Sequence, residues 1–206
     1  GAYRKYPQPH AFCHIVGYVG PVSDYDLSRI EDDDPLLRIP RFQIGKNGVE
    51  ARAEHDLRGK AEIKRIEVNS VGRVMREIDS EAGIAGKNLQ LTIDNELQNT
   101  TLNRIKDESA AVVVMDVRNG DVLVLASAPT YDPNKFVTGI SVPDWKELNE
   151  NKYRPLANKT VSGTYPPGST YKMVVALAAL EAGVIGPKET VRCLGSVEVS
   201  GRKFHC

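Results

Sequence analysis

The stretch GTYPPGSTYKMVVALAALEAG, residues 163–183, decides the fold because it predicts one buried helix with a sharply defined start. Prolines at positions 166 and 167 fix the backbone angle φ and disfavour a helix upstream of them. Residues 173–180 would be apolar on every side of a helix, which is typical of a buried helix rather than an amphipathic one. Gly183 is typical of a helix end. The stretch therefore predicts a buried central helix.

Ser169 and Lys172 lie at the start of this predicted helix, one turn apart on the same face. A serine hydroxyl becomes a good nucleophile only when a base accepts its proton. Burial and the positive end of a helix both lower a lysine pKa, which favours the neutral amine that can act as that base. Unpaired backbone N–H groups at a helix start can stabilise an oxyanion. The residues alone leave a second interpretation open, in which Ser169 caps the helix and Lys172 is solvated.

A second Ser-x-x-Lys pattern occurs at residues 200–203, within EVSGRKF. It contains a glycine and has strand-like surroundings, so its serine and lysine are expected to diverge along an extended chain. We interpret this second pattern as a chance match.

The composition is that of an ordinary globular protein, with 41% hydrophobic residues among 206. Lys plus Arg equals Asp plus Glu at 27 each, and no basic run is interleaved with aromatics, so a nucleic-acid partner is not expected. No window approaches the roughly 20 apolar residues of a transmembrane helix. Because the chain begins with Gly rather than Met, we interpret it as processed or excised, and a removed membrane anchor stays open.

Three cysteines are present. Cys13 lies in the apolar, strand-like run AFCHIVGYV, which favours a buried free thiol. Cys193 and Cys206 are compatible with a disulfide, with two ligands of a metal site, or with two free thiols, and their spacing does not separate these alternatives.

Residues 1–84 predict a small mixed domain. CHIVGYVG at 13–20 has strand composition, and the PVSDYDLSRI that follows favours a short helix. Residues 47–59 carry apolar side chains at helical spacing and end in a glycine. Residues 63–68 and 74–78 predict a hairpin.

The pattern of apolar residues in the sequence changes near residue 85, where we place a domain boundary. NLQLTID at 88–94 predicts a strand that ends on a helix N-cap, and a helix with one apolar face follows. Two apolar strands at 109–117 and 121–127 flank Asn119-Gly120, a strong hairpin signal. Strands this apolar favour a sheet covered on both faces. The fold class is therefore α+β, with residues 1–84 and 85–206 as separate domains.

The motif YPPGSTYK, with its Ser-x-x-Lys, resembles the first active-site motif of penicillin-binding proteins. Other blocks resemble, in the same order, class B penicillin-binding proteins of the elongation type, the penicillin-binding protein 2 family. These blocks cover nearly the whole chain and include HIVGYVG, IGKNGVE, LRGK, EVNSVGR, LQLTID and VVVMDVRNGDVLVLASAPTYDPN.

This resemblance implies a peptidoglycan DD-transpeptidase. Ser169 would attack the D-Ala-D-Ala carbonyl of a stem peptide to form an acyl-enzyme, with Lys172 as general base, and β-lactams would acylate the same serine. Residues 1–84 would be part of a non-catalytic pedestal, and residues 85–206 the N-terminal part of the transpeptidase domain. No cofactor or metal is expected.

The resemblance also implies partners and a location. The pedestal would dock elongation-complex membrane proteins, a glycosyltransferase and a scaffold, on the periplasmic side of the bacterial inner membrane. Some elongation-type relatives place metal ligands after the central helix, which would make Cys193 and Cys206 half of a zinc site.

The chain departs from the family pattern because the downstream Ser-x-Asn and Lys-Thr/Ser-Gly motifs do not appear, and residues 159–161 are not that second motif. We therefore expect weak or no turnover from this chain by itself. Two alternatives stay open: a β-lactamase or β-lactam sensor with the same helix, and a non-enzymatic scaffold fragment that binds a partner.

Overall fold

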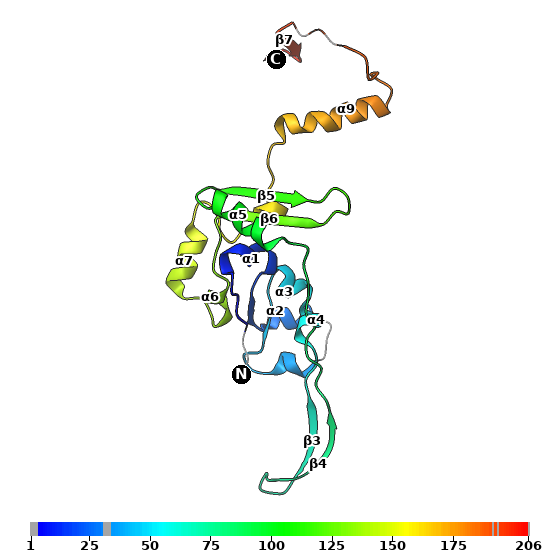
Figure 1. Ribbon diagram of the computed structural model, residues 1–206. Helices are drawn as coiled ribbons and strands as arrows, with labels where there is room; N and C mark the ends of the chain where they lie inside the picture. The colour runs from blue at the N-terminus through cyan, green and yellow to red at the C-terminus, as the bar shows by residue number, and fades with distance from the viewer. Residues whose placement is uncertain (1–3, 31–33, 191, 193, 206) are drawn as a thin grey trace. The chain divides into compact units, whose positions relative to one another are not determined.

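The computed structural model describes residues 4–30, 34–190, 192 and 194–205. The chain divides into two compact units, unit 1 (Gly1–Gly163) and unit 2 (Thr164–Cys206) (Figure 1). All strand pairs are antiparallel within the described residues, and helices alternate with two-stranded sheets. This mixture confirms the α+β class.

The first helix of unit 1, α1 (Pro9–Val16), corrects a sequence prediction, because its residues 13–16 were expected to form a strand. The helix has a proline in its first turn, and Gly17, with φ of 81°, follows its last residue. Strand structure begins only at β1 (Val19–Pro21), which pairs with β2 (Gln43–Gly45). The apolar residues of this run therefore pack as a helix in which Ala11, Cys13 and Ile15 are buried.

Short helices complete the N-terminal part of unit 1. They are α2 (Asp24–Leu27), η1 (Pro35–Arg38), α3 (Gly48–Arg52) and α4 (Glu54–Arg58). The predicted helix after Pro21 is confirmed, and Ser23 and Asp26 form a capping box at its start. Gly59 ends α4 with φ of 72°, also as predicted.

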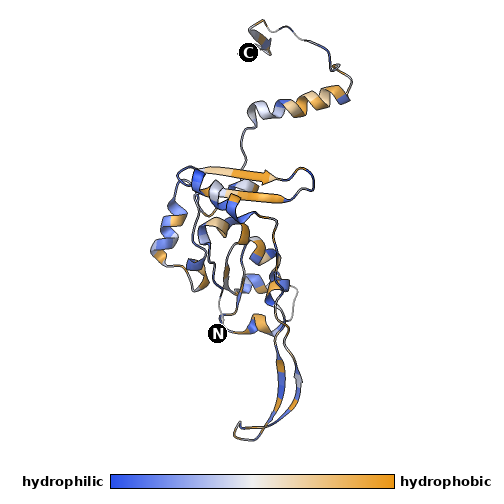
Figure 2. Ribbon diagram, viewed as in Figure 1, coloured by the Kyte–Doolittle hydropathy of each residue, from blue (hydrophilic) through white to orange (hydrophobic). Residues whose placement is uncertain are grey.

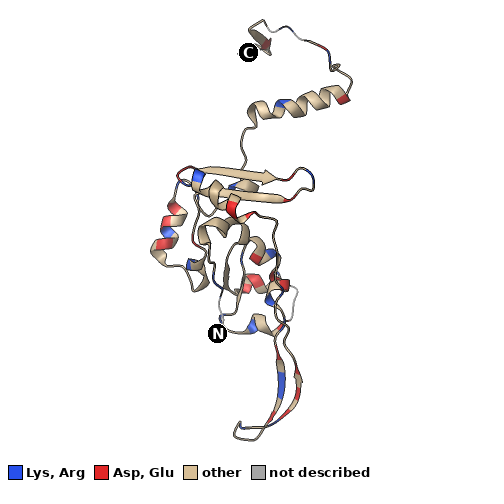
Figure 3. Cartoon of the chain, in the orientation of Figure 1, with Lys and Arg blue, Asp and Glu red and all other residues tan. Residues whose placement is uncertain are grey.

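The predicted hairpin is confirmed as β3 (Ile63–Val68) paired with β4 (Val74–Glu81). Charged residues of both signs lie along it (Figure 3), and Arg76 forms an ion pair with Glu67 across the strands. Every residue of both strands is exposed in this chain.

Residues 88–94 do not form the predicted strand. The end of this segment instead bonds β6 (Val122–Ala128): the backbone N–H of Asp94 donates to the Leu123 carbonyl at 2.9 Å, and the Thr92 hydroxyl donates to the Val122 carbonyl at 2.7 Å. The predicted N-cap is confirmed, because the Asp94 side chain accepts from Leu97 N–H at the start of α5 (Asn95–Ile105).

The second predicted hairpin is confirmed as β5 (Ala110–Met115) paired with β6. Gly120 takes φ of 81° in the turn between them, which explains the Asn-Gly sequence there. Both strands are strongly hydrophobic (Figure 2). Within unit 1, β5 alternates between half-buried and exposed residues, with Val113 and Met115 exposed, so this unit covers one face of β5 and the covering of both faces stays a prediction.

Three more helices follow the hairpin: α6 (Asn134–Val137), α7 (Val142–Glu150) and α8 (Lys159–Ser162). Side chains cap two of them, Ser141 at α7 and Asn158 at α8. Packing ties α1 to this later part of the unit. One buried cluster joins α1 to α5 and β6 through Ala11, Leu102, Val124 and Ala126, and a second contains Cys13, Tyr131 and Phe136.

Unit 2 contains η2 (Gly168–Tyr171), α9 (Lys172–Glu181) and the hairpin of β7 (Ser196–Val199) with β8 (Arg202–His205). The predicted helix in residues 163–183 is thus confirmed. Among the described residues, no helix has both the length and the apolar character needed to span a membrane.

Candidate active site

The segment that leads into Ser169 turns sharply at Gly168. Gly168 has φ of 55°, a left-handed conformation that favours glycine. Pro167 precedes it, and the first backbone bond of the turn runs from Thr170 N–H to the Pro167 carbonyl at 3.3 Å. The Pro-Pro-Gly sequence therefore ends the extended chain and starts a helical turn at once.

Ser169 lies in this 3₁₀ turn, and Lys172 is the first residue of α9. The backbone N–H of Lys172 donates to the Ser169 carbonyl, which places the two residues one 3₁₀ turn apart. No side chain caps η2 or α9. The alternative in which the Ser169 hydroxyl serves as a helix cap therefore has no support in the hydrogen bonding.

The burial expected for this helix is not found within unit 2. None of the residues of α9 is buried, and large apolar side chains such as Met173 and Leu177 are exposed. Lys172 is exposed as well. The helix is apolar between its charged ends (Figures 2 and 3). The expectation of burial rested on this pattern, and the described part of unit 2 does not supply enough chain to cover the helix.

The second Ser-x-x-Lys pattern has a different geometry. Ser200, with φ of 47°, and Gly201 form the turn between β7 and β8, and Lys203 lies on β8 paired with Glu198. The expected strand-like surroundings are confirmed. Cys193 and Cys206 lie outside the described residues, so their pairing stays a prediction.

The residues just before this segment form an anchor in unit 1 that sequence reasoning missed. The Asn158 side chain donates to the His14 carbonyl at 3.0 Å and accepts from Thr160 N–H at 3.1 Å. The Lys159 ammonium donates to the Ala128 carbonyl at 2.8 Å, and burial lowers its pKa. Residues 159–161 begin a helix rather than a strand, which agrees with the expectation that they are not the downstream Lys-Thr/Ser-Gly motif.

His14 is a neutral member of this anchor. Its Nε2 lies 2.7 Å from the Pro155 carbonyl oxygen, which can only accept, so Nε2 carries the proton. The Cys13 thiol lies 3.5 Å from the other ring nitrogen, Nδ1. Burial lowers the His14 pKa, which favours the neutral ring.

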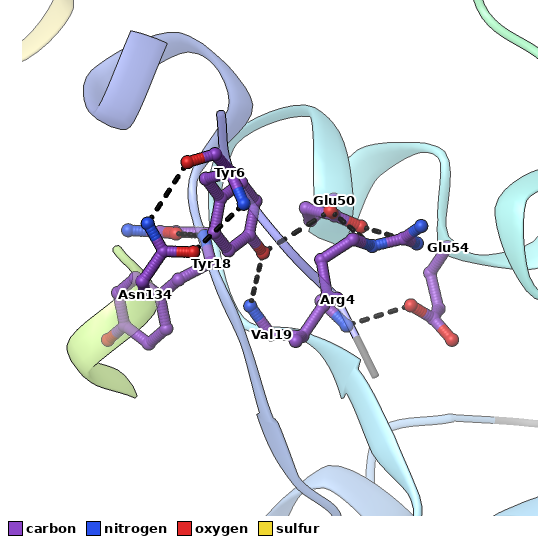
Figure 4. A network of polar contacts seen from close by, with 9 residues as sticks. Arg4, Tyr6, Tyr18, Val19, Glu50, Glu54 and Asn134 are labelled. Atoms are coloured by element: carbon purple, nitrogen blue, oxygen red, sulfur yellow. Dashed lines mark hydrogen bonds and ion pairs between the residues drawn. The ribbon is translucent and has the colours of Figure 1, made fainter. Parts of the chain in front are cut away.

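A second polar cluster fixes the N-terminal segment (Figure 4). Glu50 of α3 is only 3% exposed, and its carboxylate accepts from Arg4 at 2.8 Å and from the Tyr6 hydroxyl at 3.3 Å. The same hydroxyl accepts from Val19 N–H, and Asn134 of α6 bonds both backbone groups of Tyr6. This cluster joins α3, β1 and α6 and has a structural role.

The chain matches two family models. Residues 1–91 match the penicillin-binding protein dimerisation domain, and residues 110–205 match the penicillin binding protein transpeptidase domain.

Curated relatives include the peptidoglycan D,D-transpeptidase MrdA of Escherichia coli K12, which is 41% identical over 91% of this chain and 30% of its own length. The protein of the same name from Haemophilus influenzae is 38% identical over 91% of this chain and 29% of its own length. The chain therefore spans less than a third of the length of these relatives.

Solved structures agree with these matches. A chain of the complex of PBP2 and MreC from Helicobacter pylori matches with a TM-score of 0.87 at 33% identity. The match covers 98% of this chain and 37% of the Helicobacter chain. Pseudomonas aeruginosa PBP2 in complex with WCK 5153 has a TM-score of 0.81 at 36% identity. The match covers 98% of this chain and 41% of the Pseudomonas chain. The chain belongs to the penicillin-binding proteins, in the penicillin-binding protein 2 branch of that family.

Proposed function

We propose that this chain is part of a peptidoglycan D,D-transpeptidase in which Ser169 is the nucleophile and Lys172 its general base. The observation that carries this proposal is the placement of both residues in consecutive turns at the start of α9, with no helix-capping role for the serine. The matches to the transpeptidase-domain model and to curated D,D-transpeptidases support it.

The chemistry follows from the two side chains. The Ser169 oxygen attacks the D-Ala-D-Ala carbonyl, and its proton passes to the neutral Lys172 amine. When the peptide bond breaks, the departing D-Ala takes up this proton and leaves an ester on Ser169. The amine of a neighbouring stem peptide then attacks the ester, transfers a proton through Lys172 back to the serine oxygen, and forms the cross-link.

A β-lactam is a substrate of the same attack. The Ser169 oxygen opens the strained lactam ring, whose amine stays tethered to the acyl group rather than leaving. The tethered group hinders the incoming amine, so the ester persists. β-Lactams are therefore proposed ligands of the site, alongside stem peptides.

The organisation of the whole protein is also part of the proposal. Residues 1–84 would be pedestal and residues 85–206 the start of the transpeptidase domain. The pedestal would bind elongation-complex membrane proteins, a glycosyltransferase and a scaffold, on the periplasmic side of the inner membrane. A Helicobacter pylori relative has been solved in a complex with MreC, which supports the proposal of a protein partner.

Release of D-Ala tests the activity. We expect the longest product of the gene to release D-Ala from a pentapeptide donor in proportion to cross-link formation, and Ser169→Ala to abolish both. After β-lactam acylation, recovery within minutes would indicate a β-lactamase instead. Absence of both release and acylation would leave the scaffold function.

A further inference from the structure

Asn158 uses both ends of its side-chain amide, and each end binds a different helix. Its Oδ1 accepts from the Thr160 N–H and hydroxyl, which caps α8. Its Nδ2 donates to the backbone carbonyl of His14 in α1 at 3.0 Å. The two bonded residues, Asn158 and His14, are 144 positions apart in the chain.

The orientation of this amide is fixed by chemistry. A carbonyl oxygen can only accept and a backbone N–H can only donate, so a flipped amide would lose both contacts. An Asn that both caps one helix and binds the backbone of another can act as a rigid link between them.

Neighbouring contacts hold the same segment. The His14 ring bonds the Pro155 carbonyl, and Lys159 N–H donates to the hydroxyl of buried Ser127 in β6 at 3.1 Å. Residues 155–159 are therefore held by α1 on one side and by β6 on the other. α8 ends at Ser162, and only residues 163–168 separate it from Ser169.

We propose that Asn158 is a positioning residue for the acylation of Ser169, because it links α8, the last helix before the nucleophile, to α1. α1 lies within the region that matches the dimerisation domain, and α8 within the region that matches the transpeptidase domain. Asn158 thus ties the start of α8, which precedes Ser169 in the chain, to the backbone of α1. The inference rests on the proposed function of Ser169.

The pair Asn158→Asp and Thr160→Val separates the two roles of the amide. Asn158→Asp keeps an acceptor for the cap but places a carboxylate oxygen against the His14 carbonyl. Thr160→Val removes the hydroxyl contact with Asn158 and leaves the contact with His14. Both variants are made in the longest product of the gene, and fluorescent-penicillin acylation is measured per titrated active site, which corrects for any misfolded fraction.

We expect Asn158→Asp to lower the acylation rate constant about tenfold at neutral pH, with the non-covalent affinity for penicillin within about twofold of wild type. Thr160→Val should stay within about twofold of wild type. As pH falls, the carboxyl introduced by Asn158→Asp becomes protonated and regains a donor, so the ratio of the variant rate to the wild-type rate should rise.

Three results would overturn the inference: an unchanged rate in Asn158→Asp, an equal loss in Thr160→Val, or a loss that acid does not reduce. Ser169→Ala, run in the same series, tests the proposed function separately. Acylation that persists in Ser169→Ala would defeat that function whatever the Asn158 variants show.

Discussion

The side-chain amide of Gln98 in α5 donates to the backbone carbonyl of Ala11 in α1 at 2.9 Å. The same amide also pairs with β6, donating to the Leu125 carbonyl at 3.1 Å and accepting from Leu125 N–H at 2.9 Å. Gln98 is only 1% exposed, and its bond to Ala11 is buried while its bonds to Leu125 are partly buried. One buried side chain thus joins α1, α5 and the edge of β6.

Gln98→Leu should therefore destabilise unit 1 strongly. The substitution leaves the Ala11 carbonyl and both backbone groups of Leu125 without their partner, at a cost of about 2–4 kcal/mol in the free energy of unfolding. Urea unfolding monitored by circular dichroism measures it. Thr100→Ala, an exposed change on the same helix, should alter stability by less than about 0.5 kcal/mol. Equal stability of Gln98→Leu and wild type would contradict the role given to this amide.

Glu50 should make stability depend on pH. Burial raises its pKa above the ordinary value of 4.5, and this effect outweighs the lowering by Arg4 and the Tyr6 hydroxyl. The folded state thus holds the Glu50 proton more tightly than the unfolded state. Its contribution to stability is complete below about pH 4.5 and is lost as pH rises through the raised pKa.

Glu50→Gln tests this pH dependence, because the amide can still accept from Tyr6 but does not ionise. We expect the stability of wild type relative to Glu50→Gln to decline as pH rises from acid to neutral, measured by urea unfolding across that range. A difference that grows with pH would show that the ion pair with Arg4 outweighs burial, and a constant difference would show that the two effects cancel; either would contradict the prediction.

The Cys13 thiol should react very slowly with alkylating reagents in the folded protein. It is 1% exposed, and burial raises its pKa to about 11. Near pH 8 only about one molecule in a thousand would then hold the reactive thiolate, so alkylation should be at least about a hundredfold slower than in urea. Peptide mapping after iodoacetamide separates Cys13 from the other two cysteines. Rapid alkylation of Cys13 without unfolding would contradict the packing of α1.

Local signals in the sequence predicted several elements well. Asp94 does cap a helix, Asn119-Gly120 does form a hairpin turn, and Gly59 does end α4. In each case the determining interaction lies within a few residues in the chain. The Ser169–Lys172 spacing was predictable for the same reason.

Elements that depend on distant contacts were missed. Ile15 and Val16 favour a strand by composition, yet they lie in α1, whose buried residues pack against elements more than 80 positions away. Pro9, the first residue of this helix, and Gly17, which follows its last residue, were the local signals that could have revealed it. The strand expected at 88–94 fails because these residues contact β6 without forming a ladder.

The polar links were not predictable at all. Gln98 and Asn158 are ordinary helix and cap residues by sequence, and their partners in α1 lie 87 and 144 positions away. The apolar pattern of α9 predicted the helix correctly, but the burial that the same pattern indicated is not found within unit 2.

The most direct test of the account is covalent labelling by a fluorescent penicillin. The longest product of the gene is compared with its Ser169→Ala, Lys172→Ala and Ser200→Ala variants, and with the 206-residue chain itself. We predict labelling of the long form, none in Ser169→Ala, a rate at least about a hundredfold lower in Lys172→Ala, and a normal rate in Ser200→Ala. The 206-residue chain should label weakly or not at all. Undiminished labelling of Ser169→Ala, or no labelling of the long form, would contradict the assignment of Ser169 as the acylated nucleophile.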